Sequence, residues 1–364
     1  MNKIVIKRLR MMKKNKTSFL SKIQKSTPDK NISDVKKEVD IVLIDNVLSE
    51  ERRNKMSYSP HMIVAGKSGV VFASKWLLNQ AIKNTSDKVV IVDMFGDFKE
   101  VCNNVPGEDC AMVNISSDIF LNPLEIVSDE FDDVFQFQAK FDFLESFFEL
   151  AMNRKLTPDE RWCLDVAYKS IKRKHNKTLD NLYKSLEEIG SKDSKTLGDV
   201  LYPYLELKVF NTPSTNITSK VTYVDLSGYS SSCKEVAYMF AMEWVYEQMM
   251  KNLKEGSFTF VCLPFVENLE NIPEQFVSNF AKRARVRGGK LFFVTHETES
   301  FANRFRGAFN NIATLLLLNR NDSNFDFMKE YLALPKALDN LDIMDNRYGL
   351  LVEGSKVSIC QFNI

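Results

Sequence analysis

Short apolar runs alternate with amphipathic helical segments along most of this chain of 364 residues. Strands that alternate with helices predict a largely parallel β-sheet with helices covering its faces. The segments 72–84 and 233–253 show helical spacing of their apolar residues and are predicted to be two of these helices. The fold class is therefore α/β. Seven runs have the length and apolar content of buried strands: 61–65, 88–93, 110–115, 220–226, 257–263, 290–295 and 313–318.

Residues 127–208 have a different pattern, rich in Phe and Leu at helical spacing and without a clear strand. Thr157-Pro158-Asp159-Glu160 is typical of a helix start. We therefore predict an all-helical insertion between the third and fourth strands. Its phenylalanines are interpreted as core residues, with a binding face as the alternative. At the end of the chain, 348–352 and 356–361 flank Glu353-Gly354-Ser355 and predict a terminal hairpin.

Charge is unevenly distributed along the chain. The net charge is +1, so the chain as a whole is not a polyanion binder. Between Lys3 and Lys37, however, twelve Lys and Arg residues stand against two acids. We interpret residues 1–38 as a basic, partly disordered arm that precedes one domain of residues 39–364. The arm is either a solvated tail or a contact for DNA or an anionic membrane surface.

The six cysteines are scattered and include no C-x-x-C pair, which argues against a zinc site and a disulfide framework. Reduced thiols are the default in the cytosol. No run approaches the roughly 18 consecutive apolar residues of a membrane span, and the basic start lacks the apolar segment of a signal peptide. The sequence predicts a cytoplasmic protein, with peripheral attachment at the inner face of the membrane as an option.

Residues 61–75 have the outline of a nucleotide-binding loop: an apolar strand, a glycine turn and a helix start. A working loop reads G-x-x-x-x-G-K-[ST]. Its backbone N–H groups hold phosphates, its lysine neutralises their oxygens and its hydroxyl holds Mg²⁺. Gly66-Lys67-Ser68-Gly69 fits the first half, whereas Val70-Val71-Phe72 stands in place of the glycine, lysine and hydroxyl. We expect these side chains to fill or narrow the pocket.

From about residue 40 onward, the order of motifs resembles the motor domain of the TraC/TraE-type conjugative transfer ATPases of type IV secretion systems. That family belongs to the HerA/FtsK group of RecA-like folds, so the resemblance implies a RecA-like P-loop NTPase fold. Only the motor domain is covered, because a short basic arm replaces the family's large amino-terminal domain. The matching motifs are His61-Met62-Ile63-Val64-Ala65-Gly66-Lys67-Ser68-Gly69, Val90-Ile91-Val92-Asp93, Gly96-Asp97-Phe98, Leu121-Asn122-Pro123-Leu124, Thr222-Tyr223-Val224-Asp225-Leu226, Lys282-Arg283-Ala284-Arg285, Gly288-Gly289, Thr295-His296-Glu297 and Asn346-Arg347-Tyr348-Gly349-Leu350-Leu351-Val352.

The resemblance also implies a second catalytic element, an Asp-Glu pair that ends an apolar strand, organises Mg²⁺ and activates water. Here the strand is 257–263, and Gly256 to Val266 contains no acid. Pro264-Phe265 stands near the expected place, and His296 replaces the family's phosphate-sensing glutamine. Both Walker A and Walker B are thus degenerate relative to this family. Single groups of this kind contribute about 3–4 kcal/mol to a transition state, so losing several predicts no useful turnover.

Some residues are candidates for compensating chemistry. Lys67 or Lys75 would supply positive charge to a phosphate. Asp93 and Asp97 match acidic positions of the family and would hold Mg²⁺ or polarise a water. His296 would act as a general base. Each residue also has an ordinary interpretation: solvated lysines, aspartates that cap a turn, and a hydrogen-bonded histidine. No catalytic residue and no metal site is therefore assigned.

Arg283 and Arg285 are candidates for action in trans. In ring-forming RecA-like motors an arginine can reach the nucleotide of the neighbouring subunit and stabilise its charge. A subunit with a degenerate pocket would then still serve an active neighbour. The alternative is an ordinary basic helix end, where cations favour the helix dipole.

These observations favour a catalytically degenerate ATPase that is a structural or regulatory subunit of a conjugative DNA-transfer or type IV secretion assembly. Its expected partner is an active paralogous ATPase or another secretion protein, in a homo- or hetero-oligomer, and no cofactor is expected. An atypical motor of the same machinery, which binds and hydrolyses ATP with Mg²⁺, is the first alternative. A nucleic-acid-binding module that uses the arm and the basic residues of 282–290 is the second.

Overall fold

The computed structural model describes residues 41–43, 60–126, 133–172, 177–318, 327, 348–353 and 356–361. The predicted basic arm lies outside these residues. Within them, one sheet of ten strands carries the fold, in the order β1-β10-β9-β8-β2-β7-β6-β3-β5-β4. The strands are β1 (Ile41–Leu43), β2 (His61–Ala65), β3 (Lys88–Asp93), β4 (Cys110–Val113), β5 (Val221–Asp225), β6 (Thr259–Pro264), β7 (Gly289–Thr295), β8 (Ile312–Leu318), β9 (Tyr348–Glu353) and β10 (Lys356–Gln361).

All seven predicted strands are present, as β2 to β8, and each pairs in parallel with its neighbours among them. The predicted closing hairpin is confirmed as the antiparallel pair β9 and β10, and β9 also runs antiparallel to β8. The predicted class, a mostly parallel sheet flanked by helices, is therefore correct.

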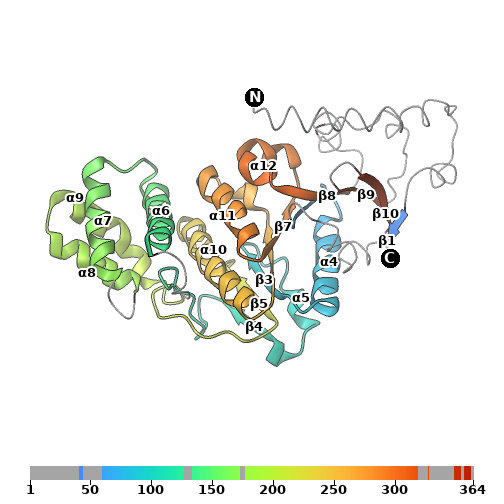
Figure 1. Ribbon diagram of the computed structural model, residues 1–364, viewed down its shortest axis with the longest axis horizontal. Coiled ribbons are helices and arrows are strands. Elements are labelled where there is room, and N and C mark those ends of the chain that lie inside the picture. The colour runs from blue at the N-terminus through green and yellow to red at the C-terminus, as the bar shows by residue number, and fades with distance from the viewer. Residues whose placement is uncertain are drawn as a thin grey trace.

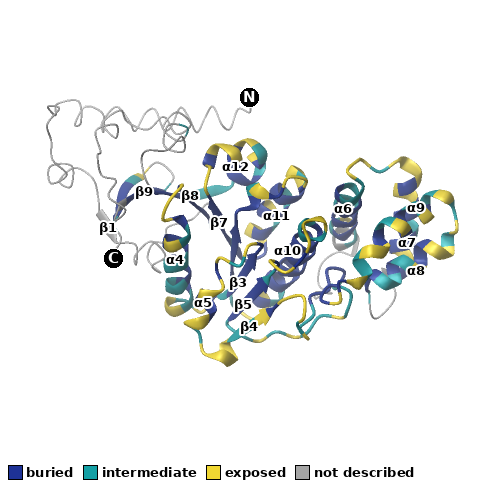
Figure 2. Ribbon diagram, turned by 180° about the vertical axis from the view of Figure 1, so that it is seen from behind, coloured by how far each residue is buried: buried dark blue, intermediate teal, exposed yellow. Residues whose placement is uncertain are grey.

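The central strands are apolar on both faces because helices cover both sides of the sheet. In β2, Met62 and Val64 join one core, whereas Ile63 and Ala65 join the other. Figure 1 shows α4 and α5 on one side of the sheet and α10 and α11 on the other. The inward faces of these helices are buried in Figure 2. The helices of the sheet region are α4 (Val70–Asn84), α5 (Glu100–Asn103), α10 (Ser231–Lys254), α11 (Glu274–Val286), α12 (Thr298–Arg304) and α13 (Arg306–Phe309).

Four further helices lie between β4 and β5, where the sequence predicts a helical insertion, and they stand to one side of the sheet in Figure 1. They are α6 (Asp133–Met152), α7 (Pro158–Lys172), α8 (Leu179–Ile189) and α9 (Lys192–Leu201). The predicted helix start before α7 forms a capping box: Glu160 N donates to Thr157 Oγ1, and Thr157 N donates to Glu160 Oε2. Phe143, Phe147 and Phe148 are buried, which agrees with the core interpretation.

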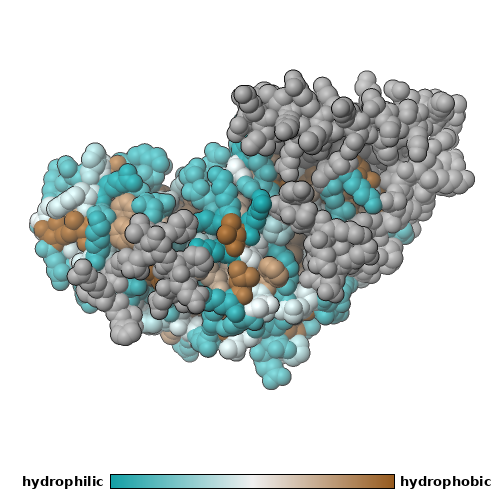
Figure 3. Space-filling view, viewed as in Figure 1, coloured by the Kyte–Doolittle hydropathy of each residue, from teal (hydrophilic) through white to brown (hydrophobic). Residues whose placement is uncertain are grey.

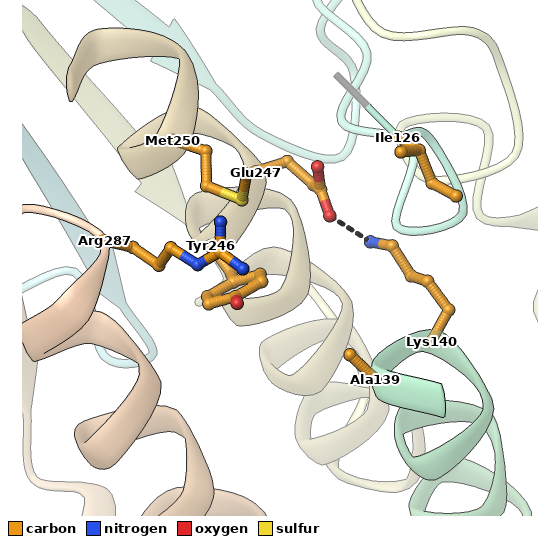
Figure 4. Close-up of a pocket in the computed structure, with 7 residues that line it drawn as sticks. All are labelled: Ile126, Ala139, Lys140, Tyr246, Glu247, Met250 and Arg287. Atoms are coloured by element: carbon orange, nitrogen blue, oxygen red, sulfur yellow. Dashed lines mark ion pairs between the residues drawn. The ribbon is translucent and has the colours of Figure 1, made fainter. Parts of the chain in front are cut away.

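A buried ion cluster joins the insertion to the sheet region (Figure 4). Lys140 of α6 is 2% exposed and donates to the carbonyl oxygen of Pro123. Its Nζ lies 2.8 Å from Glu243 Oε1 and 3.0 Å from Glu247 Oε1, both on α10. Burial lowers the pKa of Lys140, but the two carboxylates more than offset that effect, so its pKa is raised. Lys140 therefore stays charged, and α6 is held on α10 by charge as well as by packing.

Candidate functional site

The candidate site lies where the carboxyl ends of β2, β6 and β7 meet, because parallel strands end at the same edge of a sheet and ligands of such folds bind there. Strand β7 lies between β2 and β6. The loop that follows β2 therefore lies beside the ends of β6 and β7. These are the strands predicted to carry the Walker B acids and the sensor residue.

The loop after β2 is short and closes directly into α4. Gly66 N donates to the carbonyl oxygen of Thr295 over 3.2 Å. A Cβ at Gly66 would lie 2.6 Å from the carbonyl oxygen of Leu318, so only glycine fits between β7 and β8. Gly69 has φ of 74° and forms the N-cap of α4, whose first residue is Val70. The backbone turn of a nucleotide-binding loop is thus present in part.

The assignment made from the sequence is one residue early. Counted from Gly66, the pattern G-x-x-x-x-G-K-[ST] places its second glycine at Val71, its lysine at Phe72 and its hydroxyl at Ala73. The lysine and the hydroxyl are missing in this register as well. Val70 stands at the glycine position in the register predicted from the sequence. It is the first residue of α4 and is buried in the core.

Phe72 does not fill a pocket, contrary to expectation. Its side chain is 50% exposed and lies beside Trp76, with 6.1 Å between ring centroids. One helical turn separates the two residues, so they share the outer face of α4. Lys67 and Ser68 are exposed on the loop. Lys75 pairs with Glu100 of α5 at 2.8 Å and lowers the pKa of that carboxyl, so Lys75 holds α5 against α4.

Phe265 occupies the end of β6, where the resemblance places a catalytic acid. It adopts φ of 54°, a left-handed conformation that costs a non-glycine residue about 1–2 kcal/mol. Its ring is 2% exposed and stacks on the imidazole of His296, with 4.4 Å between centroids and 15° between planes. His296 Nδ1 in turn donates to the carbonyl oxygen of Gly66 over 3.3 Å. His296 itself is exposed, so the aromatic pair lies at the surface beside the loop.

Glu267 is the acid that sequence reasoning missed, one residue beyond the acid-free stretch. Its Oε1 accepts from Thr295 Oγ1 at 2.5 Å and from His296 N at 3.1 Å. Burial raises the pKa of this carboxyl, partly offset by these bonds. Glu267 thus ties the end of β6 to the end of β7 and positions the backbone of His296. Its place as the first acid after an apolar strand was the available signal.

Asp93 makes the contacts of an aspartate that caps a turn. Its Oδ1 accepts from Phe95 N and Gly96 N, and its Oδ2 accepts from Phe98 N and Tyr223 Oη, all within 3.0 Å. The side chain is buried and these bonds saturate it. Burial, followed by the Asp93 charge, raises the pKa of Tyr223, which keeps it a donor. Asp97 is exposed in the turn that Asp93 organises.

Arg283 and Arg285 point in different directions, because residues two apart on a helix do not share a face. Arg283 packs inward: its guanidinium lies 4.5 Å from the centroid of Tyr246 and 3.7 Å from Glu243. Arg285 is exposed near the start of β2, at the sheet edge opposite the loop. Among the described residues, no group of three or more His, Cys, Asp or Glu is placed to hold a metal ion.

Several solved structures resemble this one in fold. VirB4 of Thermoanaerobacter pseudethanolicus is 17% identical, with a TM-score of 0.67 over 84% of this chain and 89% of that one. This chain has the P-loop NTPase fold.

Two structures of the conjugative coupling protein TrwB share the fold. The form with sulphate is 9% identical over 90% of this chain and 92% of that one, with a TM-score of 0.59. The complex with ADP and Mg²⁺ is 8% identical over 88% of each chain, also with a TM-score of 0.59. No protein-family model and no curated protein sequence matches this chain. At identities this low, the structural likeness shows the fold alone. The activity has to be inferred from the residues of the site.

Proposed function

We propose that this chain is a catalytically degenerate P-loop NTPase of the TraC/TraE type that serves as a structural or regulatory subunit of a conjugative or type IV secretion assembly. The setting is suggested by the resemblance in motif order and by the likeness in fold to VirB4 and to TrwB, which is described as a bacterial conjugative coupling protein. The lack of activity is argued from the site itself.

The stack of Phe265 on His296 is the observation that carries the proposal. It puts two aromatic rings at the ends of β6 and β7, where phosphoryl transfer requires an acid and a polar sensor. The loop beside it offers neither a lysine nor a hydroxyl at the required positions. Because such transfer depends on positioned charge, the missing groups remove most of the means of stabilising its transition state.

The competing proposal, an atypical ATPase, needs a relocated lysine and a metal ligand. Lys75 is engaged by Glu100, and the carboxylate of Asp93 is saturated by backbone and tyrosine donors. Asp97 and Lys67 are exposed. They lie on different loops. The acid after β6, Glu267, accepts from Thr295 Oγ1 and His296 N, so we favour the degenerate subunit.

An active neighbour is the second part of the proposal. Of the two arginines, Arg285 is exposed and Arg283 packs against Tyr246, so the trans-acting role is assigned to Arg285 alone. The experiment mixes this chain with the active ATPase of the same secretion machinery and measures ATP hydrolysis. We expect the rate of ATP hydrolysis to be higher in the mixture than with the active ATPase alone. Arg285→Ala in this chain should remove that increase. Equal rates with and without this chain would refute the regulatory role.

The predicted cytoplasmic location, with peripheral attachment through the arm, remains part of the proposal. None of the helices in the described ranges is long and apolar enough to cross a membrane. DNA contact through the arm and the 282–290 segment stays an alternative, to be judged by the salt dependence of binding.

A further inference from the structure

Three exposed apolar side chains gather at the amino edge of the sheet, opposite the candidate site. Leu253 ends α10 and is 40% exposed, Phe258 precedes β6 and is 46% exposed, and Val286 ends α11 and is 76% exposed. A Cβ at Gly288 would lie 3.0 Å from Leu253 Cδ1 and 3.3 Å from Phe258 Cδ1, so these two side chains meet over Gly288. Val286 precedes that glycine by two residues.

Lysines surround this apolar cluster. Lys290 Nζ lies 4.4 Å from the centroid of the Phe258 ring, and Lys88 N donates to the carbonyl oxygen of Phe258. Val89 N donates to the carbonyl oxygen of Lys220, which brings the start of β5 to the same edge. We call this surface the amino-edge face. Its partly or fully exposed lysines are Lys88, Lys220, Lys251, Lys254 and Lys290.

Lysines outnumber acids on the amino-edge face. Asp87 is buried and pairs with Lys290 at 2.6 Å. Glu255 lies next to Lys254 in the sequence, and Asp109 lies close enough to Lys220 to favour its charged form. Burial lowers the pKa of Lys220, although Asp87 opposes this effect. Five lysines therefore face three acids. An anionic partner is therefore favoured by charge.

The side chains of the amino-edge face fit one kind of anionic partner better than another. Single-stranded nucleic acid is bound by aromatic rings on which bases stack. Phe258 is the aromatic residue of the cluster, and Lys290 already lies over its ring. Leu253 and Val286 are aliphatic and offer no stacking surface. Apolar side chains ringed by lysines are typical of surfaces that rest on anionic lipid, where the side chains enter the acyl boundary and the lysines meet headgroups.

We infer that the amino-edge face binds the surface of an anionic lipid bilayer, with Leu253, Phe258 and Val286 inserted and the lysines on the headgroups. Figure 3 shows hydrophobic residues among hydrophilic ones over the region of α10 and α11. This contact is separate from the basic arm, and it does not depend on whether the chain hydrolyses ATP.

The test is co-sedimentation of the full chain with vesicles of phosphatidylglycerol and phosphatidylcholine in equal parts, and with vesicles of phosphatidylcholine alone. The double variant Leu253→Ser with Val286→Ser should bind the anionic vesicles about tenfold or more weakly, because it removes inserted apolar surface and leaves the arm intact. Lys251→Ala with Lys254→Ala should weaken binding roughly 30-fold, since each lysine near an anionic surface contributes about 1 kcal/mol.

The matched control is Trp162→Ser with Tyr202→Ser, which removes exposed aromatic residues of the helical insertion, 60% and 59% exposed. It should bind as the wild type does. The variants change exposed side chains, except for the half-buried Lys251, and equal melting temperatures establish that each one folds. Equal binding by the Leu253→Ser/Val286→Ser variant and the wild type would overturn the inference. So would equal binding to neutral vesicles, or loss of oligonucleotide binding in the lysine variant with vesicle binding unchanged.

Discussion

The ring of Phe265 lies 4.4 Å from the imidazole of His296, with 15° between their planes. Phe265 follows β6 and His296 follows β7, and these strands are neighbours in the sheet. The resemblance to the conjugative transfer ATPases implies an acid pair near the position of Phe265 and a glutamine at the position of His296. An aromatic stack there stabilises the edge of the sheet by packing, at the position where a motor needs polar groups.

Replacing Phe265 by Ala should lower the free energy of unfolding by about 3 kcal/mol, because the ring is buried in the core beside the end of β6 and its loss leaves a cavity. Urea denaturation measures this loss. Phe95→Ala is the matched control: Phe95 is 46% exposed, and its ring lies 6.2 Å from Phe265. Phe95→Ala should lower the free energy of unfolding by well under half as much as Phe265→Ala. Equal losses for the two variants would contradict a packing role for the Phe265 ring.

Asp93 should matter for folding and Asp97 should not. Asp93→Ala removes the acceptor of three backbone N–H groups and of Tyr223, which predicts a loss of about 3–5 kcal/mol of unfolding free energy. Asp97→Ala changes an exposed side chain and should stay within about 0.5 kcal/mol. Thermal denaturation of both variants provides the comparison. A fully stable Asp93→Ala protein would show that the turn does not need the carboxylate.

The ion cluster should stabilise the fold only while it is complete. Lys140→Met removes the ammonium group that lies between Glu243 and Glu247 and leaves Glu243 with Arg283 at 3.7 Å, which predicts a loss of about 3–5 kcal/mol. Adding Glu243→Gln and Glu247→Gln should recover much of it. Lys169→Met, which breaks an exposed pair with Asp165, is the control and should cost about 0.5 kcal/mol or less. Denaturant titration of the four proteins tests this order, and no recovery in the triple variant would contradict it.

His61 should make stability fall in mild acid. It is fully buried; Nε2 donates to the carbonyl oxygen of Ala281, and Nδ1 accepts from Leu291 N. Burial lowers its pKa from 6.5 to about 4, with Arg285 adding to the effect. The unfolded chain therefore takes up the proton first, and the contribution of His61 is full above pH 6.5 and lost as the pH falls toward 4.

The size of this effect is about 3 kcal/mol between those two pH values. His61→Gln removes the titrating group, so its unfolding free energy should fall less over the same range. Denaturant titrations of both proteins at matched pH values measure the difference. Parallel pH profiles would show that His61 is already charged in the folded state.

Much of the fold was predictable because its strands are buried on both faces. Runs such as 61–65 and 88–93 have an uninterrupted apolar interior, and their strands begin and end where the runs do. The three-residue strand β1 was not predictable, because it exists by pairing with β10 at the far end of the chain. Strand order is likewise set by contacts between distant segments, which local pattern does not carry.

The site was predictable for what it lacks more than for what it holds. The sequence alone shows that the expected lysine, hydroxyl and Asp-Glu pair are missing from their positions. The contact of Phe265 with His296 joins residues on different strands, and the exposed position of Phe72 depends on where α4 begins. Glu267 was missed because it lies beyond the strand end, in a turn whose path brings it back to Thr295.

The most direct test of the degenerate site is nucleotide binding, followed as the melting temperature of the purified chain with and without millimolar ATP and Mg²⁺. A ligand at one hundred times its Kd adds about 2.7 kcal/mol of stability, which is readily measured. We predict no shift. A clear shift that Lys67→Ala or Lys75→Ala abolishes would contradict the account and identify an atypical ATP-binding site at this loop.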